Sequence, residues 1–205
     1  MITNKKIIGI GGVARSGKNS FADIMIDIYK ERGILAKHFS LAYYLKKDCE
    51  QFIQEKLNLS VWTEKTEEKS IFRPILIWYG DVKRKQTQGK YWTSMLQKDL
   101  ENSVAQINII TDVRYGVYAE DEVYWIKNVM CGKLIHISKY DLRGETKVYT
   151  QPDNEHELYN DPIVKNNSDI VVEWPTYNIN GNGSYMSMLT DINLRKIVVD
   201  TIDKL

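Results

Sequence analysis

Residues Gly12 to Ser20 read GVARSGKNS, directly after the apolar run KIIGIG at residues 6–11. They match the spacing GxxxxGK, in which glycine lets the backbone curl so that several N–H groups point inward at an anion. A helix that begins near Gly17 would add the positive end of its dipole, and Lys18 would add a full charge. We therefore interpret the stretch as a phosphate-binding loop, the alternative being a glycine-rich turn with an ordinary surface lysine.

The loop's expected ATP contacts span the whole motif: Gly12, Val13, Ala14, Arg15, Ser16, Gly17, Lys18, Asn19 and Ser20. Arg15 could contact a phosphate or, equally well, lie on the surface over the adenine. Asn19 stands where many such loops carry the Ser or Thr that holds Mg²⁺, and the hydroxyl comes one place later, at Ser20. This GKxS order resembles adenylate kinase and its relatives, which implies a small-molecule kinase rather than a motor or a switch GTPase. In those kinases Mg²⁺ keeps more of its water.

The composition is typical of one globular domain that spans residues 1–205. Hydrophobic residues make up 43% of the chain and charged residues 27%, and the formal net charge is +1. We therefore expect no bulk attraction to a nucleic-acid polymer or to a membrane, so any anion site must be local. Cys49 and Cys131 show no CxxC spacing. Because no apolar run has the length of a signal peptide or a membrane helix, we expect a cytoplasmic protein.

Strands and helices alternate along the chain, which predicts an α/β fold with a mainly parallel sheet flanked by helices, as in P-loop kinases. The expected strands are 6–11, 35–40, 106–111, 132–138 and 169–173. The expected helices are 17–32, 41–57, 72–85, 91–101, 118–129 and 188–205. Residues 60–69 read as a solvated loop or a helix start, residues 139–167 as a segment that could hold a mobile lid, and residues 178–185 as a Gly/Asn-rich loop.

Several motifs, in order, resemble the bacteriophage deoxynucleoside monophosphate kinases. GVARSGKNSFAD at 12–23 is similar to that family's GxxRSGKDTxAD, RPILIWYGDVKR at 73–84 to RPLLQxLGxxxR, and ITDVRY at 110–115 to ITDVRF. SLAYYLK at 40–46 is similar to (F)ADPLK but lacks its Asp and Pro, and YW at 91–92 and DIVV at 169–172 also match. Asn19 replaces the family's usual Asp.

The resemblance implies phosphorylation of a nucleoside monophosphate by ATP with Mg²⁺, in a protein with a helical acceptor-binding region at about 41–102 and a lid at about 139–167. It suggests a homodimer, and if the chain is viral its site of action is the host cytoplasm. The acceptor-binding residues that we expect are Lys46, Arg73, Trp78, Arg84, Lys85 and Arg114.

Three residues are the expected catalytic groups. Lys18 would neutralise the outer phosphates. Asp112 ends a buried strand at the edge where ligands bind in open α/β sheets, so with Ser20 it is expected to hold Mg²⁺ through water, the alternative being an acid that caps a turn. Arg143, in the lid, would bring positive charge onto the transferred group.

Most of the acceptor residues also have a simpler interpretation, and for Lys46 it is that of an ordinary surface lysine. Arg73 and Arg84 lie three helical turns apart and could clamp one phosphate, or they could form a solvated basic face. Arg114 could bind the acceptor phosphate or pair with Asp112. Trp78 could stack on the acceptor base or belong to the core.

Two rival functions stay open at this point. The changed Ala42-Tyr43-Tyr44 turn allows a kinase of another small phosphorylated metabolite. Asn19 allows a nucleotide-binding module that has lost catalysis.

Overall fold

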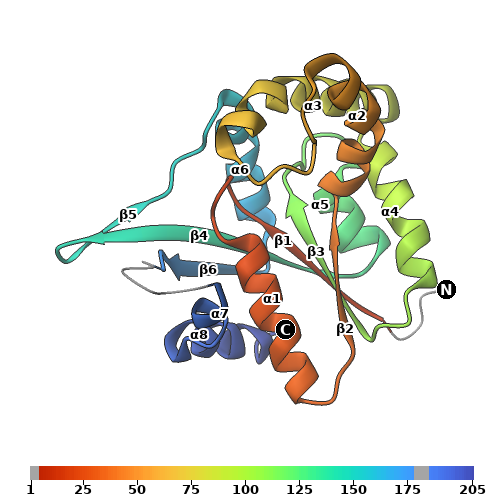
Figure 1. The fold of residues 1–205 in the computed structure, drawn as a ribbon. Coiled ribbons are helices and arrows are strands. Elements are labelled where there is room, and N and C mark those ends of the chain that lie inside the picture. The colour runs from red at the N-terminus through yellow and green to blue at the C-terminus, as the bar shows by residue number, and fades with distance from the viewer. Residues whose placement is uncertain (1–4, 178–184) are drawn as a thin grey trace.

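A central sheet organises the protein (Figure 1). The computed structural model describes residues 5–177 and 185–205. Among these residues the strands are β1 (Lys6–Gly11), β2 (Ala36–Ser40), β3 (Ile107–Val113), β4 (Lys133–Arg143), β5 (Thr146–Tyr149) and β6 (Ile170–Pro175). Their order is β2-β3-β1-β4-β5, and β6 also pairs with β4. Every pairing is parallel except that of β4 with β5, so the predicted fold class is confirmed.

The register brings the carboxyl ends of the central strands to one edge of the sheet. Gly11 at the end of β1 pairs with Val113 of β3 on one side and with His136 of β4 on the other. The loop that follows β1 therefore starts beside Asp112, as expected for ligand-binding groups in an open α/β sheet.

Two layers of helices cover the sheet (Figure 1). On one face, α1 (Lys18–Glu31) and α8 (Ile192–Ile202) pack over β1, β4 and β6, with the short α7 (Tyr185–Leu189) beside them. The opposite face is covered by α4 (Lys90–Asn102), α5 (Glu122–Tyr124), the π-helix η1 (Trp125–Val129) and α6 (Glu155–Asn167). Because both faces are covered, β1 is apolar from Ile7 onward, with Ile7 turned to one core and Ile8 to the other.

A helical layer lies beyond the carboxyl edge of the sheet, at the top of Figure 1. It consists of α2 (Ala42–Leu57) and α3 (Thr66–Thr87), which pack around Ile53 and Phe72 in a small core of their own. This layer stands over the loop after β1 and occupies most of the region that the sequence assigns to an acceptor.

Three predicted helices have different bounds. The helix expected at 72–85 begins at Thr66, because Glu67 and Glu68 favour the positive end of its dipole. The helix expected at 118–129 begins only at Glu122, since the Asp121 carboxylate accepts the N–H groups of Val117 and Tyr118 and holds them in a turn. The last helix is interrupted before Ile192, where Asp191 caps α8 by accepting from Asn193 and Leu194.

Segment 139–167 is more ordered than a polar, poorly periodic sequence suggests. Strand β4 continues to Arg143 and turns at Gly144 into β5, and α6 then packs on the sheet through the buried Val164. Its role as a lid stays a prediction, which now concerns the β4–β5 hairpin and the chain up to α6. The predicted loop at 178–185 lies outside the described residues except for Tyr185, which begins α7.

Candidate functional site

The loop between β1 and α1 has a backbone that requires glycine. Gly12 has φ 135° and Gly17 has φ 88°. A Cβ on Gly12 would lie 2.6 Å from the Ile137 carbonyl oxygen, and a Cβ on Gly17 would lie 2.6 Å from Trp174 Nε1. Both positions therefore exclude larger residues, and the chain curls between them before α1 starts at Lys18.

Lys18 lies folded back on this loop. Its Nζ donates to the carbonyl oxygens of Gly12 at 2.8 Å and Val13 at 2.7 Å, and only 6% of the residue is exposed. Burial, together with the charge of Arg114, lowers the pKa of Lys18 to about 8. The ammonium group is thus held by neutral oxygens close to an inward-facing anion site.

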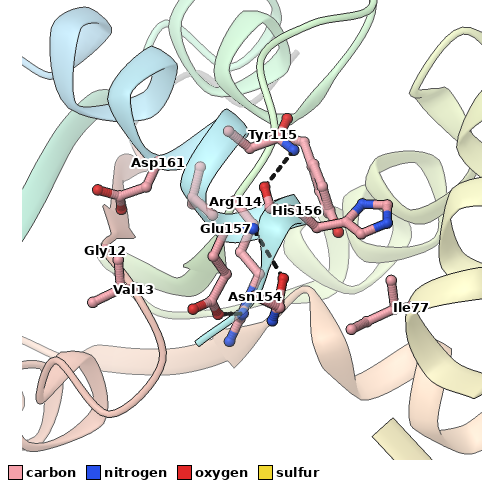
Figure 2. A pocket seen from close by; sticks show the side chains of 11 residues that line it. Gly12, Val13, Ile77, Arg114, Tyr115, Asn154, His156, Glu157 and Asp161 are labelled. Atoms are coloured by element: carbon pink, nitrogen blue, oxygen red, sulfur yellow. Dashed lines mark hydrogen bonds and ion pairs between the residues drawn. The ribbon is translucent and has the colours of Figure 1, made fainter. Parts of the chain in front are cut away.

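A carboxylate of the chain itself occupies that site. The Ala14 N–H donates to both oxygens of Glu157 at 3.2 Å, and Arg114 Nη1 lies 2.6 Å from Glu157 Oε1. Figure 2 shows the Glu157 side chain turned toward Arg114, beside Gly12 and Val13. One N–H of the loop thus donates to an oxyanion of the chain itself, and binding of a phosphate by several loop N–H groups stays a prediction.

Asp112 and Arg114 leave the carboxyl end of β3 toward the same site. Ser40 Oγ donates to Asp112 Oδ2 at 2.8 Å, and Arg114 Nη2 lies 3.4 Å from Asp112 Oδ1. Burial alone would raise the pKa of Asp112, but the charges of Arg114 and Lys18 and the Ser40 hydrogen bond outweigh it and bring the pKa to about 2. Asp112 is therefore ionised at neutral pH. The ion pair that we considered as an alternative role for Arg114 is present.

One cavity of about 590 Å³ joins the loop to the helical layer. Of the expected site residues, its wall contains Ala14, Arg15, Gly17, Lys18, Asn19, Ser20, Lys46, Arg73, Arg84, Asp112 and Arg114. The rest of the wall is largely apolar and aromatic, with Leu41, Leu45, Val61, Phe72, Leu76 and Trp92. Cationic groups and an apolar surface thus face one space.

The two arginines of α3 are already engaged. Arg73 Nη1 lies 3.0 Å from Asp153 Oδ2, and Arg15 pairs with the same carboxylate. Arg84 is 3% exposed, makes two hydrogen bonds to Asp121 and stacks over the Tyr115 ring at 3.4 Å. Their shared helix face does not bring them to a common partner, and the phosphate clamp stays a prediction.

Besides Gly12, Val13 and Ser16 of the loop, three expected residues do not line this cavity. Trp78 is 66% exposed, Lys85 is exposed, and Arg143 ends β4 at the exposed tip of the β4–β5 hairpin, far to the side in Figure 1. The same strand brings Lys139 to the loop instead, where its Nζ donates to the Arg15 carbonyl oxygen at 3.3 Å and the residue lines the cavity.

Sequence reasoning missed Asp153, Glu157, Asp121 and Glu122. One signal was readable for Glu157: Asn154 caps α6 by accepting the Glu157 N–H at 3.0 Å, an N-x-x-E pattern that marks a helix start. The pattern does not say where the Glu157 carboxylate points. Glu122 lines the cavity, and its burial, together with the charge of Asp121, raises its pKa to about 8.

Comparisons with protein-family models and with curated proteins found no match. Among solved structures, a crystal structure of shikimate kinase from Bacteroides thetaiotaomicron is similar to this chain with 11% sequence identity and a TM-score of 0.39. The match covers 97% of this chain and 96% of that one. At this low similarity, the function has to be argued from the geometry above. Within the described ranges, no helix is long and apolar enough to cross a membrane.

Proposed function

We propose that the protein transfers the γ-phosphoryl group of ATP to a nucleoside monophosphate, most specifically a deoxynucleotide, and yields ADP and a nucleoside diphosphate. The observation that carries the proposal is the shared cavity. Lys18 of the loop, Asp112 and Arg114 at the sheet edge, and Lys46 and Arg73 of the helical layer all line one space. Phosphoryl transfer needs positioning and charge rather than covalent help, and this set of residues supplies both.

The donor set fits ATP with Mg²⁺. The Ala14 N–H already donates to a carboxylate that stands in for phosphate, and Lys18 is held next to it. Among the described residues no group of three or more His, Cys, Asp or Glu side chains could hold a metal ion. This favours a metal held by phosphate oxygens and water, which Ser20 and Asp112 would orient. When bound, MgATP supplies the transferable phosphoryl group and its counter-charge.

Each residue then has a defined task. Lys18 moves from the loop carbonyls onto the outer phosphates. Asp112, kept ionised by Arg114 and Lys18, would orient water around Mg²⁺. Arg114 and Arg73 bind the acceptor phosphate, while the apolar part of the wall, which includes Leu45 and Leu76, would contact a base. Arg143 would reach the transferred group only if the β4–β5 hairpin closes.

A second acceptor class is favoured by one feature. Where the similar kinases have Ala-Asp-Pro, this chain has Ala42 on the cavity wall, Tyr43 packed against Trp62 at 5.5 Å, and Tyr44 hydrogen-bonded to Asp99. The missing acid alters the acceptor side of the cavity, and another small phosphorylated metabolite is the alternative substrate.

The test is ADP production from MgATP with each deoxy and ribo monophosphate in turn. We expect turnover with one or a few deoxynucleotides, reduced on the order of 10²–10³-fold in Lys18→Ala, which removes one preorganised charge from the transition state. If no nucleotide stimulated ADP production but another phosphorylated metabolite did, the alternative acceptor would be favoured. ATP binding without any turnover would indicate an inactive nucleotide-binding module.

A further inference from the structure

Two carboxylates at the start of α6 contact the same donor groups that a bound phosphate would need. Glu157 accepts from the Ala14 N–H and from Arg114, as described above. Asp153 pairs with Arg15 and with Arg73, the latter at 3.0 Å. One N–H of the loop and three arginines on the wall of one cavity are thus contacted by two acids from a single turn of chain.

The two acids form one unit rather than two independent surface pairs. Glu157 Oε2 also accepts the Asp153 N–H at 3.1 Å, so the carboxylate that faces the loop fixes the backbone of its partner. In the Glu157–Arg114 pair the side chains are 10% and 34% exposed, so solvent screens it only partly. In the Asp153–Arg15 pair the acid is 16% exposed but Arg15 is 64% exposed, so this pair is screened more strongly. Asn154 caps α6 between them and holds the turn in place.

Carboxylates and phosphates use the same chemistry here. Both are oxyanions that take hydrogen bonds from backbone N–H groups and bidentate contacts from arginine. A phosphate that approached Ala14, Arg114, Arg15 and Arg73 would find its positions filled. A cavity of about 30 Å³, enough for one water, also lies against Glu157, Asn160 and Gly12.

From this geometry we propose that Asp153 and Glu157 form an internal plug: without ligand, their two carboxylates occupy the phosphate site. A phosphate that binds there must displace both carboxylates. The ligand class is a polyphosphate or phosphate monoester dianion. The proposal rests on the proposed function only in that both need the loop to bind phosphate. The affinity for phosphate is then reduced by the fraction of molecules in which the plug is closed.

The test is calorimetric binding of inorganic tripolyphosphate and of ATP to the wild-type protein and to Glu157→Gln. Glutamine keeps the shape but loses the charge-assisted bonds to Ala14 and Arg114, so we expect binding about tenfold tighter or more. Asp153→Asn should act in the same direction. Glu155→Gln is the matched control, because it removes the same charge from the same exposed turn and should change affinity less than about twofold.

Equal or weaker binding by Glu157→Gln, relative to wild type, would overturn the plug. If neither protein bound tripolyphosphate or ATP, the phosphate-binding loop itself, and with it the proposed function, would be refuted. A measurement on the unmodified protein avoids dependence on any variant. Saturating tripolyphosphate should speed amide hydrogen exchange at Asp153, whose N–H loses Glu157, and unchanged protection there would contradict displacement.

Discussion

The buried pair of Arg84 and Asp121 offers a sharp test of what holds the acceptor side of the cavity together. The Asp121 side chain is 0% exposed and that of Arg84 is 4% exposed. Asp121 accepts from Arg84 Nε at 3.0 Å and from Nη2 at 2.6 Å, and also from the N–H groups of Val117 and Tyr118. The pair thus fixes both α3 and the turn before α5.

Asp121→Asn would keep the shape and remove the charge that compensates a buried guanidinium. Breaking a buried pair by removing one partner costs about 3–5 kcal/mol. Because Asn keeps one oxygen that can accept from Val117 or Tyr118, we expect the lower end, about 3 kcal/mol of the free energy of unfolding. Asp81→Asn is the matched control. Asp81 contacts Arg84 Nη1 at 3.2 Å but is 42% exposed, so its loss should cost less than about 1 kcal/mol.

Urea unfolding followed by circular dichroism would measure both values from the midpoint and the slope. The reasoning is refuted if Asp121→Asn stays within about 1 kcal/mol of wild type, since a pair worth so little would not behave as a buried one. If that variant instead lost acceptor binding at unchanged stability, Arg84 would be a substrate ligand, as the helix spacing suggested.

Three further predictions concern the cavity. The pKa of Lys18 is lowered from 10.5 to about 8, and anion binding needs the charged form of this side chain. ATP affinity, measured by calorimetry, should therefore fall about tenfold between pH 7 and pH 9. The Lys18→Ala variant should not show this pH dependence. The pKa of Glu122 is raised from 4.5 to about 8, so between these pH values the folded state holds a proton that the unfolded state has lost. The free energy of unfolding should therefore fall by about 1.4 kcal/mol for each pH unit as the pH rises from 4.5 to about 8. Glu122→Gln should lack this slope in urea unfolding at pH 5, 6.5 and 8. In steady-state kinetics, Lys139→Ala should lower kcat/KM for ATP about tenfold and Arg143→Ala less than twofold, and the reverse order would indicate that the β4–β5 hairpin closes.

The parts of the site that sequence predicts are those built by neighbouring residues. The strand, the glycine turn and the helix at 6–31 follow from local periodicity and from the spacing of two glycines. Asp112 and Arg114 follow from the rule that parallel strands present their carboxyl ends at one edge. These features need no knowledge of distant contacts.

The parts that sequence did not predict depend on side chains that meet across long separations. Glu157 reaches Ala14 from 143 residues away, and Arg84 reaches Asp121 from 37 residues away. The eleven-residue spacing of Arg73 and Arg84 places both on one helix face, but Arg84 is buried against Asp121, while Arg73 stays part exposed on the cavity wall and pairs with Asp153. The spacing along a helix predicts which way a side chain points, but the packing around it decides which residue it contacts.

The charge of the empty cavity explains why acids far away in sequence are recruited to it. Lys18, Arg15, Arg73 and Arg114 converge there to bind anions, and without compensation each would disfavour the folded state by like-charge repulsion and lost hydration. Asp112 supplies part of that compensation to Arg114 and Lys18, and further compensation in the absence of ligand comes from Asp153 and Glu157. The same two carboxylates therefore stabilise the ligand-free protein and compete with its ligand. A change that removes these contacts should raise the affinity for phosphate and lower the stability of the ligand-free protein.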